Sequence, residues 1–398
     1  MNTRLSPTND QDRIVTLDML RGFALLGIIL ANSLHFQFGL LYDTDLTNPY
    51  PNGFIDQLSE AFILILVQAS FYPLFSFLFG YGMAMQKTRM LEKGLNFNAV
   101  YWRRTVILGI VGYIHGIFLW NGDVLFAYAW TAALLFFFLM MPARGLIISG
   151  LIIMGLLGSC AAVPDAFWNI GTEGMVEDPS IAFSEKEVDV LSEGTYAEIV
   201  SFRLTENPLW PGLFGEILMV LNGVITVIGL FLVGAYVMRK GWIADPFLHK
   251  KKWKWIMWVG LIVALITKSP TVFFADSMQL EYLQMLVGGP FLTAFFVAAF
   301  TLAATTEAGR KLLQPFSFAG RMAFTNYLTQ SLVMTFIFYP YGLGLFNSIG
   351  VFAGGMIAIA VFIIQVILSK LWLNYFRIGP LEWLWRAGTY MTVPKFKR

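Results

Sequence analysis

The sequence predicts an all-α polytopic membrane protein, in which about ten transmembrane helices form one domain over residues 1–398. Hydrophobic residues make up 57% of the chain and charged residues only 13%, whereas a soluble domain is usually about 25% charged. Apolar runs of roughly 20 residues, the length that crosses a bilayer as a helix, recur along the chain. Basic residues gather in alternate loops between these runs. A water-soluble surface cannot be built from this mixture, so the outer face must meet lipid.

The apolar runs divide the chain into ten predicted spans. Because lipid offers no hydrogen-bond partner to backbone amides, each span should be a helix. The first run has no small-residue cleavage site behind it, so we expect a retained helix rather than a signal peptide. The predicted spans are 19–40, 57–86, 100–120, 124–141, 146–163, 212–238, 253–270, 283–304, 318–340 and 349–372.

The basic residues predict that both ends of the chain lie in the cytoplasm. Lysine and arginine concentrate in the cytoplasmic loops of membrane proteins. With the N-terminus inside, all 27 basic residues except Lys186, Arg203 and Lys268 fall on the cytoplasmic side. An even number of spans returns the C-terminus to that side.

One predicted extracytoplasmic loop, 164–211, is long and acidic, with ten acidic and two basic residues. Its stretch 195–206 has helical spacing of apolar residues at Ile199 and Phe202. The loop is either a solvated cap or a lid over an outward-facing site.

Charged residues at the inner ends of two spans are candidates for binding an anion. Asp18 and Arg21 are three residues apart and share a helix face, so they can pair. They either fix the depth of the first helix or anchor an anionic ligand. Arg103 and Arg104 open the third span as positive-inside anchors or as a phosphate clamp, since guanidinium groups bind phosphate oxygens through paired hydrogen bonds.

Two histidines lie within or near the spans. His115 is flanked by apolar residues, and Asp123 ends a turn shortly after it. An imidazole near a carboxylate is the basic unit of general base catalysis, although a neighbouring helix could equally satisfy this histidine. His35 lies near the outer end of the first helix. Asn32, on the same helix, is eleven residues and thus about 16 Å beyond Arg21. Exposure to water at the membrane interface is the alternative explanation for a histidine at position 35.

Further polar positions are predicted inside the bundle. Asn326 and Gln330 are one helical turn apart on the ninth span, where they either join helices or line a hydrophilic path for a substrate. Pro73 should kink or break the second span.

Several other kinds of site are excluded. The single cysteine, Cys160, rules out a disulfide and thiolate metal clusters, and the three histidines lack zinc-type spacing, so we expect no metal. There is no P-loop, dinucleotide fingerprint or GxSxG motif. We expect the lipid bilayer as a partner and no nucleic acid.

Four segments together resemble the YeiB family, also called the domain-of-unknown-function 418 family. The resemblance covers essentially the whole chain and implies a multi-pass protein of the bacterial cell (inner) membrane. The matching segments are 17–28 (LDMLRGFALLGI), 75–82 (FSFLFGYG), 103–123, and the pair 320–326 and 379–386.

A more distant similarity is to transmembrane acyltransferases such as heparan-glucosaminide N-acetyltransferase. It rests on the Asp-x-x-Arg-Gly opening at Asp18 and on Asn32, eleven residues after Arg21. That group implies a cytoplasmic acyl-CoA donor, an acceptor on the far side and an essential histidine between them. One branch places this histidine about ten residues after the first-helix arginine, where this chain has Ala31 and Asn32. His35 or His115 must then serve instead.

Two functions follow as hypotheses. In the first, Arg21, Arg103 and Arg104 hold acyl-CoA, His115 or His35 acts as the base with Asp123 orienting it, and an envelope sugar or lipid head group is the acceptor. Asp18, Asn32, Asn326 and Gln330 would then line the substrate path. In the second, the protein is a transporter or lipid translocator without acyl chemistry, built on interrupted helices such as the second span.

Overall fold

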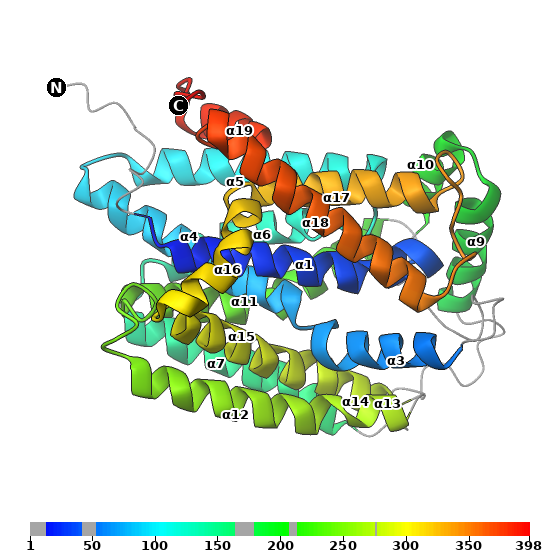
Figure 1. Ribbon diagram of the computed structural model, residues 1–398, viewed down its shortest axis with the longest axis horizontal. Helices are drawn as coiled ribbons and strands as arrows, with labels where there is room; N and C mark the ends of the chain where they lie inside the picture. The colour runs from blue at the N-terminus through cyan, green and yellow to red at the C-terminus, as the bar shows by residue number, and fades with distance from the viewer. Residues whose placement is uncertain (1–12, 42–52, 164–178, 207–212, 275–276) are drawn as a thin grey trace.

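The computed structural model describes residues 13–41, 53–163, 179–206, 213–274 and 277–398, which form a bundle of helices (Figure 1). These residues contain no β-strand beyond an isolated bridge between Phe376 and Lys397. The predicted all-α class is therefore confirmed. In chain order the elements are α1 (Val15–Phe38), α3 (Phe54–Phe62), the π-helix η2 (Ile63–Val67), α4 (Phe71–Glu92), α5 (Phe97–Phe118), α6 (Leu125–Phe138), α7 (Ala143–Gly158), the 3₁₀-helix η3 (Ser159–Ala162), α9 (Pro179–Glu193), α10 (Tyr196–Thr205), α11 (Leu213–Arg239), α12 (Lys250–Lys268), α13 (Pro270–Phe273), α14 (Met278–Tyr282), the π-helix η5 (Leu283–Gly288), α15 (Gly289–Ala303), α16 (Glu307–Arg321), α17 (Ala323–Phe338), α18 (Val351–Tyr375) and α19 (Pro380–Tyr390).

Seven helical segments in the described part of the chain are long and apolar enough to cross a membrane. They match the first, second, fifth, sixth, seventh, eighth and tenth predicted spans. The other three predicted spans coincide with α5, α6 and α17. Of these, α6 has 14 residues and α17 has 16, which is shorter than a straight span, and α5 carries two arginines near its start.

The prediction of one continuous helix over 318–340 is wrong at its inner end, because the chain is interrupted at Met322 between α16 and α17. The break leaves amides at the start of α17 without helical partners. The Glu382 carboxylate of α19 accepts hydrogen bonds from two of them, Phe324 N at 2.7 Å and Thr325 N at 3.1 Å. The interruption is therefore stabilised by a residue far along the chain.

The second span is also interrupted, between η2 and α4 rather than at Pro73. Pro73 lies in the first turn of α4, where a missing amide proton leaves no helical bond unmade. The carbonyls freed by the break are satisfied by other helices. Lys268 donates to the Gln68 carbonyl at 2.5 Å, and Thr293 donates to the Ser70 carbonyl at 2.6 Å.

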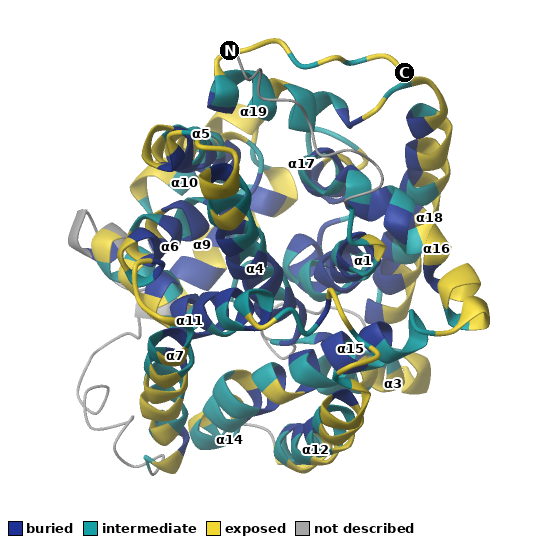
Figure 2. Ribbon diagram, turned by 90° about the vertical axis from the view of Figure 1, so that its left-hand side faces the viewer, coloured by how far each residue is buried: buried dark blue, intermediate teal, exposed yellow. Residues whose placement is uncertain are grey.

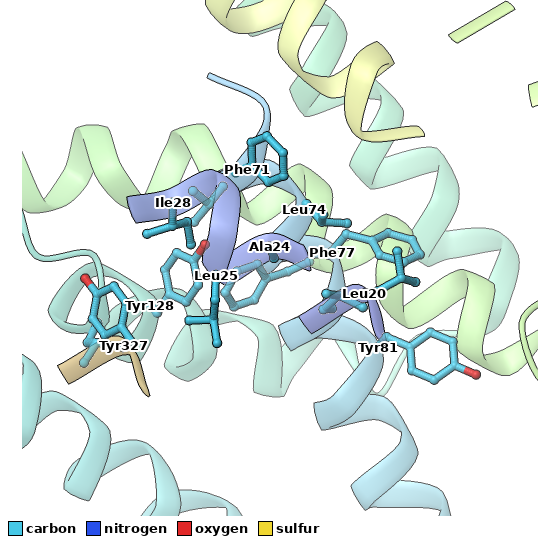
Figure 3. Close-up of a cluster of buried hydrophobic side chains, with 14 of the residues drawn as sticks. Leu20, Ala24, Leu25, Ile28, Phe71, Leu74, Phe77, Tyr81, Tyr128 and Tyr327 are labelled. Atoms are coloured by element: carbon cyan, nitrogen blue, oxygen red, sulfur yellow. The ribbon is translucent and has the colours of Figure 1, made fainter. Parts of the chain in front are cut away.

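Glycines bring the central helices into close contact. A Cβ on Gly22 of α1 would lie 1.9 Å from the Phe316 carbonyl oxygen of α16, and one on Gly80 of α4 would lie 2.0 Å from that of Phe231 in α11. Membrane helices pack closely through such small residues. Figure 3 shows apolar side chains of α1 and α4, among them Leu20, gathered in the resulting core.

The outer faces of the peripheral helices are apolar. On α7, for example, Ile148, Leu151 and Leu156 are more than half exposed, as the yellow surface of this helix in Figure 2 illustrates. The start of α1 and helix α19 lie at one end of the bundle, whereas α9 and α10 lie at the opposite end (Figure 1). This placement agrees with the two ends of the chain sharing one side of the membrane.

Candidate active site

A buried histidine and carboxylate meet towards the α9–α10 end of the bundle. His115 lies in the last turn of α5, and Asp123 lies in the turn before α6. His115 Nδ1 is 3.0 Å from Asp123 Oδ1, and the two side chains are 1% and 2% exposed. The distance suits an ion pair, but the ring is not aligned for a hydrogen bond, and neither ring nitrogen has a hydrogen-bond partner among the described residues. Catalytic hydrogen bonds are often poorly aligned before substrate binds.

The Asp123 carboxylate is held in place by three further groups. Its Oδ2 accepts hydrogen bonds from Leu125 N at 3.0 Å and Phe126 N at 3.3 Å, so the carboxylate caps the first turn of α6. Its Oδ1 accepts a hydrogen bond from the Tyr327 hydroxyl at 3.0 Å. The position of the carboxylate beside His115 is therefore set by both α6 and α17.

Sequence reasoning missed Tyr327. Its ring centroid is 5.5 Å from that of His115, and it is 5% exposed. The only local signal is that it follows Asn326 on a polar stretch of an otherwise apolar helix. An aromatic residue in a membrane span is ordinary, so no local pattern predicts that this hydroxyl lies on Asp123.

Helices α9 and α10 pack directly over this site. Tyr196 donates to the Phe118 carbonyl at 2.9 Å and Arg203 donates to the Ile117 carbonyl at 3.2 Å, so two residues of α10 satisfy the end of α5. Ile199 is fully buried. The helix expected at 195–206 is confirmed, and the described part of the acidic loop is a packed cap; residues 164–178 and 207–211 lie outside the described residues.

Glu187 of α9 ties this cap to the site. Its carboxylate accepts hydrogen bonds from Leu40 N at 2.7 Å and from Asn121 Nδ2 at 3.3 Å, and the residue is 2% exposed. Burial raises the pKa of Glu187, and the two hydrogen bonds and the charge of Arg203 act against that rise. Asn121 is two residues before Asp123 in the turn between α5 and α6. Glu187 of α9 therefore contacts the same turn that carries the Asp123 carboxylate.

At the opposite end, arginines gather around the start of α1. Asp18 is buried and pairs with Arg21, at 3.3 Å from Nη1 to Oδ1, and with Arg13. The predicted contact between Asp18 and Arg21 is thus present. Arg104 lies in the electrostatic neighbourhood of Arg21. Arg103 precedes Arg104 by one residue, about 100° around the helix, and its Nε has no hydrogen-bond partner among the described residues.

The polar residues of α17 join helices. Asn326 donates to Ser369 Oγ at 3.0 Å, and Gln330 donates to Gln365 Oε1 at 3.0 Å, both on α18. Gln330 also donates to the Leu25 carbonyl of α1 at 3.4 Å. Of the two interpretations of this stripe, these contacts favour the joining of helices.

The remaining candidates lie on α1. Asn32 and His35 are half-buried, and the His35 carbonyl accepts a hydrogen bond from Gly39 N at 3.1 Å. The described residues contain no group of three or more His, Cys, Asp or Glu side chains that could hold a metal ion.

Known proteins similar to this chain span nearly its whole length. A family model described as "Protein of unknown function (DUF418)" matches residues 237–392. The uncharacterized protein YxaH of Bacillus subtilis is 34% identical over 98% of this chain and 97% of its own length. The uncharacterized protein YeiB of Escherichia coli is 30% identical over 95% of this chain and 96% of its own length.

Proposed function

The chain belongs to the YeiB/DUF418 family, and we propose that it is a membrane-embedded acyltransferase that moves an acyl group from cytoplasmic acyl-CoA to an extracytoplasmic acceptor. The observation that carries this proposal is the buried contact between His115 and Asp123. A histidine whose second nitrogen, Nε2, has no partner among the described residues is poised to exchange a proton with a bound substrate.

In the proposed reaction, His115 Nε2 removes a proton from a hydroxyl or amine of the acceptor. The acceptor attacks the thioester carbonyl, the carbon–sulfur bond breaks, and CoA leaves as the thiol after taking a proton. Asp123 stabilises the imidazolium that forms, and the Tyr327 hydroxyl keeps the carboxylate oriented.

The donor is proposed to bind at the opposite end of the bundle. Arg21 and Arg104 lie near one another there, and their guanidinium groups suit the phosphates of acyl-CoA. The positive-inside rule assigns this end to the cytoplasm. The chain would be a multi-pass protein of the bacterial inner membrane, with an envelope sugar or lipid head group arriving beneath α9 and α10.

The direct test is release of free CoA from labelled acyl-CoA by the purified protein, with envelope extract as acceptor. Replacing His115 or Asp123 should each lower transfer by about 10²–10⁴-fold. The double variant should be little worse than the worse single variant, because such groups act as a unit. Additive losses would contradict a shared role. If the wild type releases no CoA with several acyl chains and several extracts, the proposed enzymatic function is contradicted.

A transporter or lipid translocator is the second candidate, and paired interruptions favour it. The interruption after η2 lies against a second irregular segment, the π-helix η5 and the start of α15. Gln284 of η5 donates to the Leu64 carbonyl at 2.9 Å, and a Cβ on Gly289 of α15 would lie 1.9 Å from the Ala69 carbonyl oxygen. Facing interrupted helices are a feature of transporters. A transporter would release no CoA in any variant.

A further inference from the structure

The C-terminal amphipathic helix α19 brings a further arginine to the group at the cytoplasmic end. The positive charges of Arg13 and Arg21 act on Arg386, and the charge of Arg386 acts on Arg104. Trp385 fixes α19 against α5, because its Nε1 donates to the Arg104 carbonyl at 3.4 Å. Three helices, α1, α5 and α19, therefore contribute arginines to one region.

The positive charges of this region exceed the negative charges available to them. Asp18 already pairs with two arginines, Arg13 and Arg21. Glu382 is occupied by the amides at the start of α17. Neither Arg104 nor Arg386 forms an ion pair with any described residue.

The Trp385 ring of α19 positions the Arg104 guanidinium, and the Arg386 side chain is half-buried. The Arg104 guanidinium lies 4.2 Å from the centroid of the Trp385 ring. Such a contact with the face of the ring leaves the N–H groups at the edge of the guanidinium able to donate. The Nε of Arg104 has no hydrogen-bond partner among the described residues. Burial is the largest influence on the pKa of Arg386 and lowers it; Tyr390 and Glu382 act against this, while nearby arginines lower it further. Half-buried like charges repel, so a bound anion would relieve an existing cost.

We propose that Arg104 and Arg386, together with Arg21, form a binding site for a cytoplasmic ligand that carries several phosphate groups, with α19 as one wall. The proposal rests on the assignment of this end to the cytoplasm and deepens the proposed donor site. Guanidinium groups pair with phosphate oxygens through two parallel hydrogen bonds. Arginines from three helices match an anion with spread charges, such as a pyrophosphate-bearing nucleotide, better than a single carboxylate.

The site is connected to the histidine pair through α19 and α17. Glu382, one helical turn before Arg386, accepts a hydrogen bond from Thr325 Oγ1 at 2.6 Å as well as from the α17 amides. Two residues further along α17, Tyr327 reaches Asp123. Occupation of the site would therefore steady the helix that orients the proposed catalytic carboxylate.

The test measures binding to the full-length protein in detergent by isothermal titration calorimetry, with coenzyme A, inorganic pyrophosphate and inorganic phosphate as probes. We expect affinity to fall in that order and to weaken as salt rises. Arg386→Gln should weaken coenzyme A and pyrophosphate binding by about tenfold or more, the effect of one lost charged hydrogen bond. Arg386→Lys, which keeps the charge without the paired geometry, should fall between.

Arg144→Gln is the matched control, because Arg144 is an exposed arginine at the start of α7. It should bind like the wild type. The melting temperature of each variant shows whether it is folded, and Arg386→Lys keeps the test valid if Arg386→Gln is not. Coenzyme A and pyrophosphate binding that is equal in wild type, Arg386→Lys and Arg386→Gln, or that is absent from the wild type, would overturn the site.

These outcomes are separate from those of the proposed reaction. Binding that depends on Arg386, without any release of CoA from acyl-CoA, would leave the polyphosphate site standing and remove the acyltransferase. Release of CoA by a protein whose ligand binding does not depend on Arg386 would remove the polyphosphate site and leave the acyltransferase standing.

Discussion

At the scale of single residues, the proposed chemistry depends on how the Asp123 carboxylate is held beside His115. Asp123 accepts hydrogen bonds from the Tyr327 hydroxyl and from the first amides of α6, and its Oδ1 also lies 3.0 Å from His115 Nδ1. The chain neighbourhood of His115 and Asp123 predicted their pairing, because only a short turn separates them. Tyr327 was not predictable, because it reaches the carboxylate from a helix about 200 residues further along.

Tyr327→Phe tests this arrangement, since it removes one hydroxyl and keeps the ring. We expect acyl transfer to fall by about 3–10-fold, the value of one neutral hydrogen bond, with the melting temperature nearly unchanged. CoA release measures the effect. Tyr375→Phe removes an exposed hydroxyl, at 73% exposure, and should leave transfer unaltered. Equal activity of Tyr327→Phe and wild type would show that this hydroxyl does not orient the carboxylate.

A second residue prediction concerns the pH dependence of the outer cap. Burial raises the pKa of Glu187 above its ordinary value of 4.5, so the docked cap holds a proton more tightly than the undocked one. Docking should thus be favoured at low pH and weaken as pH rises from 4.5 through the raised pKa. Glu187→Gln should remove this dependence and keep the cap docked at neutral pH.

Hydrogen exchange of the α9 and α10 amides, corrected for intrinsic rates, measures docking across this pH range. Glu193→Gln, at an exposed position of the same helix, is the matched control and should behave like the wild type. Exchange in Glu187→Gln that varies with pH as in the wild type would contradict the assignment.

At the scale of elements, the apolar runs predicted most of the bundle, and the interruptions were the main surprise. Helix α17 starts within a predicted span because Glu382, 57 residues beyond Thr325, caps it. The second span breaks before Pro73 because Lys268 and Thr293 satisfy its carbonyls. Breaks of this kind depend on tertiary partners, which a local pattern does not contain.

Close packing of α1 against α16 gives an element-scale prediction. A Cβ on Gly320 would lie 1.8 Å from the Asp18 carbonyl oxygen, so Gly320→Ala must push the two helices apart. We expect it to lower the free energy of unfolding by about 1–3 kcal/mol or more. Gly355→Ala on α18 makes the same chemical change where no atom lies within 4 Å. Unfolding in detergent measures both, and equal stability of the two variants would contradict this packing.

At the scale of the whole molecule, composition and the placement of basic residues predicted an α-helical membrane bundle with its ends on one side. The site was only half predictable. The charges of Arg21 and Arg386 both act on Arg104, and Arg386 belongs to a C-terminal helix that no spacing connects to α5. His35 and Asn32 share α1 with Arg21, and their place in the site stays a prediction.

Topology is testable by labelling intact cells that carry single-cysteine variants with Cys160 replaced. A cysteine at Ser192, exposed on α9, should react with an impermeant thiol reagent. A cysteine at Lys251, exposed at the start of α12, should react only after the membrane is opened. The reverse labelling pattern would invert the orientation and remove the cytoplasmic assignment of the arginine site.

The most direct measurement of the central claim compares CoA release by His115→Ala and His35→Ala in the same acyl-CoA and envelope-extract assay. His249→Ala, at the residue that precedes α12, is the third variant. If His115 is the general base, His115→Ala should lose about 10²–10⁴-fold in transfer while still binding coenzyme A, because the arginine group lies at the other end of the bundle. The other two variants should stay close to wild type. Full turnover by His115→Ala with loss of activity in His35→Ala would contradict the account and move the catalytic role to His35.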